Sequence, residues 1–330
     1  MRQQQSLRGV FMTVTDYLLS NSEAWLQYCV HINLLHEKKS TLSELKETAL
    51  QDSKIKAYLR DISNYHGQLV SNHKNPELPI HKLHFLLDIG FDTSVPEIKT
   101  AISEITKHKD EHGIYQSLTN IPKHFGGTGE DIFGWCLCDA PLLLSALVKA
   151  GVSYEEHIKQ VVDYLANLPQ MPGYPCTVSK EFGKFRGPGR KSDCCPYATL
   201  VMLRLFAELP EYRDSDLANK NIDAIFTLWE SSLERHPYMF YMGTDFRKLK
   251  APAIWYDIVG VANCLSRFDY AKKDSRFKEM LEIIKGKQNE EGLFIPESVY
   301  QKCKGWDFGQ KKVPSPYLTY LCTKILKRSK

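Results

Sequence analysis

The feature that most constrains this chain is a repeated layout: a glycine-containing loop, a polar or aromatic cluster, and then an apolar helix. Four segments share the layout. Their apolar helices begin near Asp139, Asp193, Asp257 and Pro316, at spacings of 54, 64 and 59 residues. A fifth, weaker copy begins around Pro79. Self-similarity at this spacing indicates one supersecondary unit repeated along the chain.

Helical periodicity covers most of the sequence, whereas strand alternation is nearly absent. Proline and glycine fall between the periodic stretches rather than within them. The pattern predicts an all-α chain, organised as a single domain over 1–330, with the clearest repeats in 76–330 and helices of undetermined role in 1–75. The predicted helices span 41–63, 96–107, 141–150, 154–168, 196–209, 216–233, 254–268, 275–287 and 316–328.

Each apolar helix is followed by a more charged, amphipathic one, for example 155–168. A helix that is apolar on most of its surface must be surrounded, while an amphipathic helix can face water. Alternation of the two kinds predicts inner and outer layers, that is, an α/α toroid of about five helix pairs. An open solenoid of helix pairs is the alternative. Asp or Ser beside Pro at the inner-helix starts would gather the helix N-termini at one mouth.

Composition excludes several classes of protein. The chain has 43 Lys and Arg against 39 Asp and Glu, a balance that does not favour nucleic-acid binding. No apolar run approaches the length of a transmembrane helix, and the N-terminal stretch lacks signal-peptide organisation. The nine cysteines lie mostly within apolar helical runs, which is typical of a reducing compartment. We therefore expect a cytoplasmic protein.

The densest polar cluster spans 184–197. Its Gly/Pro-rich loop carries Arg186, Arg190 and Lys191 and leads into a helix N-terminus, an arrangement that holds phosphate or another polyanion. A solvated basic loop is the alternative. Next to it, Asp193 and Cys195 lie two residues apart and offer zinc a carboxylate and a thiolate. The alternative roles are a helix cap for the aspartate and a small buried hydrophobe for the cysteine.

This block resembles the superfamily of protein prenyltransferase β-subunits and terpenoid cyclases, which are α/α toroids with a central cavity. The resemblance covers roughly 95–330 by layout and also includes the turn QNEEGLF at 288–294. It implies that Arg186 and Arg190 hold an isoprenoid diphosphate. It also implies that Asp193 and Cys195 bind zinc, with Asp257 where the family has a histidine.

The chain departs from the family in two further places. The sequence FGWCLCD at 133–139 replaces a His-Gly-Gly element, and only Asp139 remains where the cyclases carry a D-x-D-D acid motif. Asp139 is either a lone acid in an apolar cavity or a first-turn residue before Pro141. Aromatic residues at the inner-helix starts either line the cavity or pack between repeats. With the adjacent Asp307, they are Trp135, Tyr197, Trp255, Tyr256, Trp306 and Tyr317.

We therefore expect an enzyme with a central aromatic-lined cavity that acts on an isoprenoid or another apolar substrate bearing phosphate. Its reactive centre would contain Asp139, Asp193, Cys195 and Asp257, and the last three would act either as zinc ligands or as acid/base groups. One alternative is a non-catalytic toroid that binds a peptide, a lipid or a partner protein. The other is a carbohydrate-active α/α barrel.

Overall fold

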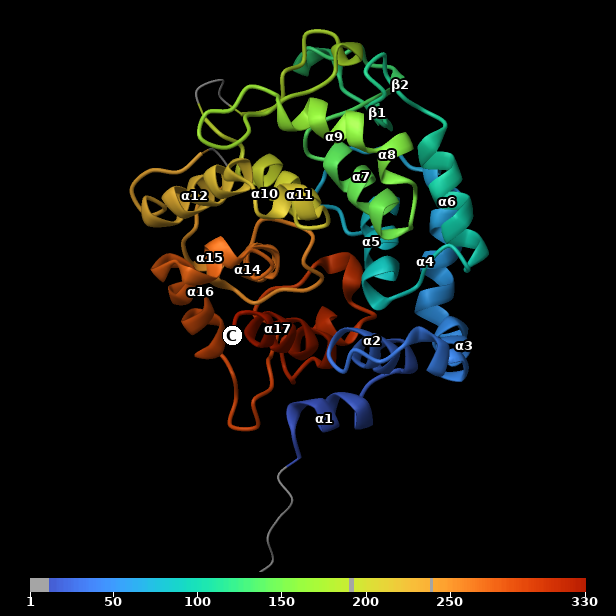
Figure 1. Ribbon diagram of the computed structural model, residues 1–330, viewed down its shortest axis with the longest axis vertical. Helices are drawn as coiled ribbons and strands as arrows, with labels where there is room; N and C mark the ends of the chain where they lie inside the picture. The colour runs from blue at the N-terminus through green and yellow to red at the C-terminus, as the bar shows by residue number, and fades with distance from the viewer. Residues whose placement is uncertain (1–11, 190–192, 238–239) are drawn as a thin grey trace, which may run out of the picture.

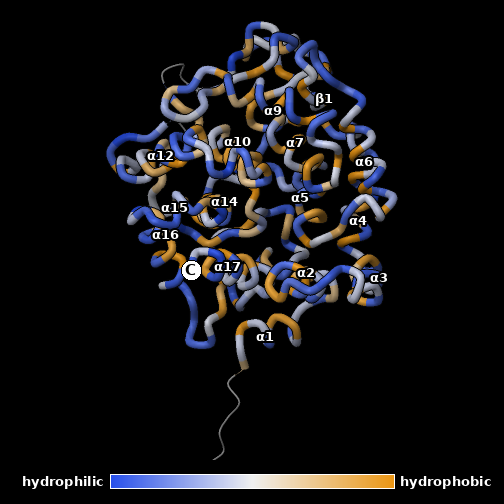
Figure 2. Tube along the Cα trace, in the orientation of Figure 1, coloured by the Kyte–Doolittle hydropathy of each residue, from blue (hydrophilic) through white to orange (hydrophobic). Residues whose placement is uncertain are grey.

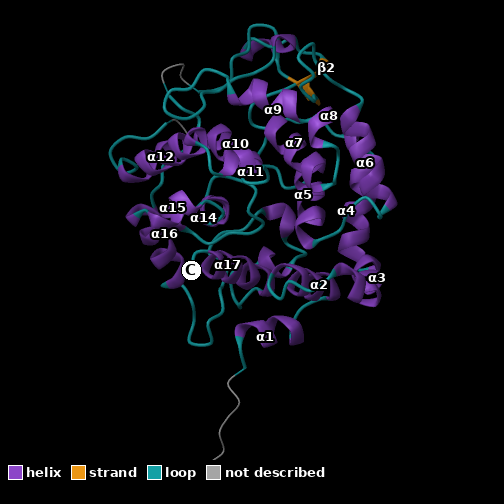
Figure 3. Ribbon diagram, in the orientation of Figure 1, coloured by secondary structure: helices purple, strands orange, loops and turns teal. Residues whose placement is uncertain are grey.

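A computed structural model describes residues 12–189, 193–237 and 240–330. Over this part of the chain the all-α prediction is confirmed, and Figure 3 shows helices joined by long loops. The exception is one small antiparallel sheet that pairs β1 (Ser117–Asn120) with β2 (Asp131–Gly134). This sheet lies in the segment before α7 (Ala140–Lys149). These four-residue strands were not predicted, because they are too short to show alternation in the sequence.

Six largely buried helices contact one another in a closed cycle, each touching the next and the last touching the first (Figure 1). In cycle order they are α2 (Ala24–Asn33), α5 (Pro79–Ile89), α7 (Ala140–Lys149), α10 (Pro196–Phe206), α14 (Ile258–Leu265) and α17 (Pro316–Arg328). We call them the inner helices. The N-terminal region therefore takes part in the cycle, because α2 contacts both α5 and α17.

A second set of helices packs outside the inner helices and alternates hydrophobic with hydrophilic positions (Figure 2). The contacts α2–α3, α5–α4, α7–α6, α10–α12 and α14–α16 pair the two sets. These helices are α3 (Ser43–Gln51), α4 (Ser53–Ser63), α6 (Pro96–Thr106), α12 (Asp216–Glu230) and α16 (Ser275–Lys285). Shorter helices are α1 (Val14–Ser20), α8 (Tyr154–His157), α11 (Pro210–Arg213), α13 (Thr244–Arg247) and α15 (Asp269–Lys273). A further helix, α9 (Lys159–Ala166), contacts α8. Single 3₁₀ turns lie at Lys39–Thr41, Tyr65–Gly67, Lys123–Phe125, Lys180–Phe182, Gln301–Cys303 and Asp307–Gly309.

Three predicted helices have different bounds in the structure. The span 41–63 is two helices, because the Asp52 carboxylate accepts hydrogen bonds from the next backbone amides and starts α4. The span 154–168 is divided at Ile158. The span 254–268 begins later because Asp257 is extended, at φ −139° and ψ 170°, and caps α14 from outside.

The repeat seen in the sequence recurs in the backbone geometry. Thr199 Oγ1 accepts a hydrogen bond from the amide of Tyr174 at 3.0 Å, and Thr319 Oγ1 accepts one from the amide of Phe294 at 3.0 Å. In both copies the carbonyl of that aromatic residue accepts the amide of the inner helix's N-cap residue. The glycine loops also match, since Gly113, Gly173 and Gly292 all have positive φ.

Candidate functional site

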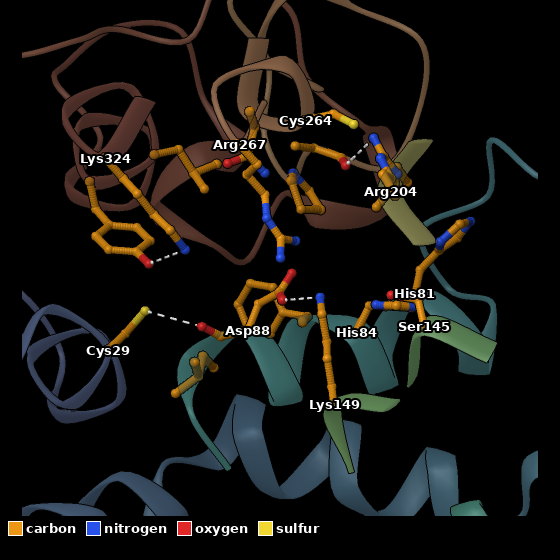
Figure 4. A pocket seen from close by; sticks show the side chains of 18 of the residues that line it. Cys29, His81, His84, Asp88, Ser145, Lys149, Arg204, Cys264, Arg267 and Lys324 are labelled. Carbon is orange, nitrogen blue, oxygen red and sulfur yellow. Dashed lines mark hydrogen bonds and ion pairs between the residues drawn. The ribbon is translucent and has the colours of Figure 1, made fainter. Parts of the chain in front are cut away.

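A cavity of about 120 Å³ lies between the inner helices, and all six of them contribute to its wall (Figure 4). The segment 252–254, which precedes α14, closes one side. A wider, more open cavity of about 610 Å³ adjoins it at the C-terminal ends of the inner helices. Six residues line both: Asp88, Lys149, Glu208, Arg267, Lys324 and Arg328. The central cavity therefore faces this outer one.

The lining is strongly charged. Five basic residues line the central cavity against two acidic ones, which leaves a formal excess of three positive charges. The basic residues are Lys149, Arg204, Arg267, Lys324 and Arg328, and the acidic ones are Asp88 and Glu208. An excess of one sign on half-buried side chains around a cavity is unfavourable unless a counter-charge is supplied.

Ion pairs neutralise part of this charge. Lys149 Nζ lies 2.6 Å from Asp88 Oδ1 and 3.5 Å from Glu208 Oε1. Arg267 binds Glu208 through two nitrogens, at 2.5 Å and 2.8 Å. Burial would raise the pKa of Asp88, but Lys149 and His84 hold it below its ordinary value. The two carboxylates are thus fully engaged with Lys149 and Arg267.

Three basic side chains have no carboxylate partner in the part of the chain that the structure describes. Arg204 Nη2 donates to the Ala253 carbonyl at 3.0 Å. Arg328 Nη1 makes longer contacts, 3.3 Å to the Asn263 carbonyl and 3.4 Å to Ser266 Oγ. Lys324 Nζ donates to the hydroxyl of Tyr320 at 3.1 Å. Burial lowers the pKa of Lys324 to about 8 and also lowers the pKa of Arg328.

Two buried histidines on α5 line the same wall. His81 Nε2 donates to the His73 carbonyl at 2.8 Å, and His84 Nε2 donates to the Leu142 carbonyl at 2.9 Å. Burial lowers the pKa of His81 to about 3 and that of His84 to about 4. Both imidazoles are therefore neutral at pH 7, and each keeps Nδ1 as a hydrogen-bond acceptor. They add no charge to the cavity.

None of the residues predicted for a reactive centre lines the central cavity. Asp139 and Asp257 directly precede their inner helices and are buried, and Cys195 is the buried N-cap of α10. The Asp139 carboxylate accepts the Cys136 amide at 2.8 Å and lies 3.6 Å from His73 Nε2. Asp193 is half-buried in the loop before α10. The predicted helix-start positions are confirmed, and a reactive role for these residues stays a prediction.

Asp257 has the most unusual environment of this set. One carboxylate oxygen accepts the Gly260 amide at 2.8 Å, whereas Oδ2 is buried with no hydrogen-bond partner among the described residues. Burial raises the pKa of Asp257 to about 6. The positive charges of Lys250 and Arg204 oppose this rise. Asp257 is not among the residues that line the cavity.

Cysteines gather at the starts of α7 and α10. The Cys195 thiol accepts the Ala198 amide at 3.5 Å, and the thiols of Cys138 and Cys176 influence its pKa. The contact with Cys138 and burial raise the pKa of Cys195 well above its ordinary value, so this thiol is protonated at neutral pH. Within residues 12–189, 193–237 and 240–330, no three His, Cys, Asp or Glu side chains are arranged to hold a metal. The zinc ligand set Asp193, Cys195 and Asp257 stays a prediction.

The predicted anion loop lies partly outside the described residues, which do not include Arg190 and Lys191. Arg186 is exposed, and its guanidinium donates to the carbonyls of Gly183 at 2.9 Å and Phe185 at 2.7 Å. Its hydrogen bonds therefore go to its own loop.

Of the predicted aromatic residues, Tyr317 lines the cavity wall, and the other five pack between segments outside it. Trp135 Nε1 donates to Asp110 at 2.8 Å, and Tyr197 donates to the Ile254 carbonyl at 3.1 Å and packs 4.2 Å from Trp255. Tyr256 and Trp306 lie in buried aromatic clusters, and Asp307 accepts hydrogen bonds at the start of α17. The contacts of these five residues fit packing between repeats, which is the alternative that the sequence left open. Phe85, Tyr317 and Tyr320 are the aromatic residues that line the cavity.

A sequence signal for the charged lining existed. Polar residues recur at helical spacing inside the otherwise apolar inner helices, and spacings of three or four place them on one face. These helices were predicted to be apolar, and candidate site residues were assigned only at their N-terminal ends. The stripes are His81, His84 and Asp88; Ser145 and Lys149; Asn263 and Arg267; and Tyr320, Lys324 and Arg328.

Comparison with known proteins adds no relative. No protein-family model matches the sequence, and no curated protein gives a significant match. None of the described helices combines the length and apolarity that crossing a bilayer requires.

Proposed function

We propose that the chain is an α/α toroid that binds a small phosphorylated or otherwise polyanionic molecule at its centre. The closed cycle of contacts among the six inner helices supports the toroid, as does the outer helix packed on most of them. A linear solenoid would leave its first and last inner helices apart, whereas α2 contacts α17. A toroid and a phosphate-bearing ligand are the two parts of the prenyltransferase-like hypothesis that the geometry favours.

The charge of the cavity supports an anionic ligand. Five basic groups converge from three inner helices and the turn after α14, and two of them are neutralised by carboxylates. A di- or trivalent anion would balance the remaining charge, and phosphate oxygens accept hydrogen bonds from both guanidinium and ammonium groups.

A purely structural role for the basic residues is the rival explanation. Cations are favourable near helix C-termini, where they bind the last carbonyls. This role fits Arg267, which binds the Ala207 carbonyl at 2.7 Å, and Arg328, which contacts the Asn263 carbonyl. It does not fit Lys324, which faces the cavity and whose ammonium bonds, among the described residues, only a tyrosine hydroxyl. The position of the Lys324 ammonium, facing the cavity with no carboxylate partner among the described residues, is the observation that carries the proposal.

Thermal unfolding in the presence of inorganic phosphate tests it. A ligand that binds only the folded state raises the melting temperature with concentration. We expect phosphate to protect the wild type, and Lys324→Met to lose roughly tenfold or more in affinity. Lys302→Ala, an exposed lysine outside the cavity, is the matched control and should keep full protection.

Arg186→Ala distinguishes the central cavity from the basic loop. Binding at the centre should be unchanged by this substitution. If phosphate fails to protect the wild type, or if Arg186→Ala removes protection while Lys324→Met retains it, the central site is refuted.

A further inference from the structure

Lys324 and Arg328 face more than the central cavity. Both also line a third cavity of about 290 Å³ between the end of α2 and α17, together with His36 and Lys327. The other residues of that wall are Ile32, Asn33 and Leu34, so its described lining has no carboxylate. The central cavity and this third cavity therefore share two cations, and the third one adds a lysine and an imidazole beyond them.

The shared residues lie along one helix. Lys327 and Arg328 follow Lys324 by three and four residues on α17, so both lie on the same side of the helix as Lys324 in its last two turns. Across from them, α2 ends in a tight turn in which the Glu37 amide donates to the His31 carbonyl at 3.0 Å. His36 occupies the left-handed region in that turn, at φ 57°, which is uncommon for a residue other than glycine. The turn thus holds His36 at the cavity wall.

The carboxylates nearby are engaged elsewhere. Glu37 pairs with His31 Nδ1 at 2.8 Å, and Asp92, near the start of α6, pairs with Lys39 at 2.8 Å. Lys327 is exposed, and its closest polar contact is Thr15 Oγ1 on α1 at 3.5 Å. A path of positive charge therefore runs from the centre of the ring, past Lys324 and Arg328, to Lys327 at the surface.

We propose that the ligand carries a chain of two or more linked phosphate groups, an inference that rests on the proposed function. One phosphate binds inside, among Arg204, Arg267 and Lys324. The next ones follow α17 outward to Lys327 and His36. Linked phosphates fit this path because each group offers several acceptor oxygens and adds negative charge, and the cations succeed one another along the helix.

Isothermal titration calorimetry on the full-length chain, with phosphate, diphosphate and tripolyphosphate as probes, tests this inference. We expect affinity to rise at least about tenfold with each added phosphate, because each gains charge-assisted hydrogen bonds. Lys327→Ala, alone and with His36→Ala, should weaken tripolyphosphate binding about tenfold and leave monophosphate binding unchanged. Both positions lie at the surface end of the path, so the fold should tolerate the changes, and Lys302→Ala controls for overall charge.

The outcomes separate this inference from the proposed function. If monophosphate binds but the longer chains bind no tighter, or if Lys327→Ala weakens all three probes equally, the chain-of-phosphates inference is wrong and the central site stands. If a hexaglutamate peptide binds as tightly as tripolyphosphate, the path recognises net charge alone, which also overturns the inference. If no probe binds, the proposed function itself fails.

Discussion

Lys149 of α7 donates a hydrogen bond to Asp88 of α5 across 2.6 Å, and so joins two neighbouring inner helices beside the central cavity. The same ammonium lies 3.5 Å from Glu208, which in turn binds Arg267. This chain of four charges connects α5, α7 and the turns that follow α10 and α14. It ties the C-terminal ends of these helices together and sets how much positive charge the cavity keeps.

Glu208→Gln should separate these two roles. The substitution removes one of the two negative charges and weakens the bidentate contact with Arg267, so we expect a loss on the order of 3 kcal/mol in the free energy of unfolding. We expect anion affinity to rise about tenfold, because a nearby repulsive charge is gone. Urea unfolding and sulfate titration measure the two effects, with the exposed Glu44→Gln as control. Unchanged sulfate affinity would show that the charge balance does not govern binding.

Anion binding should depend on pH through Lys324. Its pKa lies at about 8, so the ammonium is charged below that pH and becomes neutral above it. Sulfate keeps its own charge over this range, and its affinity should fall as the pH rises from 7 to 9. Among the groups that face Lys324, Asp88 is already ionised there, Lys149 has a raised pKa, and burial raises the pKa of Cys29 to about 11.

The control for this pH dependence is Lys324→Met. This variant should bind sulfate more weakly and with no fall in affinity between pH 7 and 9. If Lys324→Met keeps the wild-type fall of sulfate affinity with pH, the group that titrates is not Lys324.

Asp257 should make stability depend on pH in mildly acidic solution. Burial raises its pKa to about 6, so between pH 4 and pH 6 the folded state binds more protons than the unfolded chain. Stability should therefore fall as the pH rises through this range, and the ionised carboxylate should cost on the order of 3 kcal/mol above it. Asp257→Asn retains an acceptor for the Gly260 amide but cannot ionise.

Urea unfolding of Asp257→Asn from pH 4 to pH 7.5 checks this sign. The variant should gain stability relative to the wild type as the pH rises, whereas Glu290→Gln, an exposed carboxylate, should follow the wild type. A constant difference between Asp257→Asn and the wild type would mean that Asp257 is ionised throughout.

The matching threonines of two repeats should contribute equally. Thr199→Val or Thr319→Val keeps the volume but leaves a buried amide, of Tyr174 or Phe294, without its acceptor. Each variant should lose about 1–3 kcal/mol of unfolding free energy. Thr227→Val on the exposed face of α12 should change it by less than about 0.5 kcal/mol. A loss at only one of the two buried positions would show that the repeats are not equivalent in energy.

The sequence predicted the features that depend on local chemistry. Glycines with positive φ, prolines in the first helical turn and apolar runs locate the starts of α7, α10, α14 and α17 to within a few residues. The same patterns could not show that α2 contacts α17, because that contact joins segments almost three hundred residues apart. Nor could they assign a hydrogen-bond partner to Arg186, whose acceptors are loop carbonyls.

The charged lining shows a different limit. Lys149, Arg204 and Lys324 each look like an ordinary polar residue near the end of a helix, a position that favours cations for local reasons. Their convergence depends on how six helices pack around a common centre, which no single segment specifies. Only the recurrence of polar residues on one face of several apolar helices signals it.

Anomalous X-ray diffraction from a crystal of the protein soaked in tungstate, a heavy tetrahedral anion, tests the central site most directly. We predict that the strongest anomalous peak lies within the ring, within hydrogen-bonding distance of Lys324 Nζ, and that it disappears in Lys324→Met. A strongest peak beside Arg186 and the loop that leads into α10, with none at Lys324, would contradict an anion site at the centre of the ring.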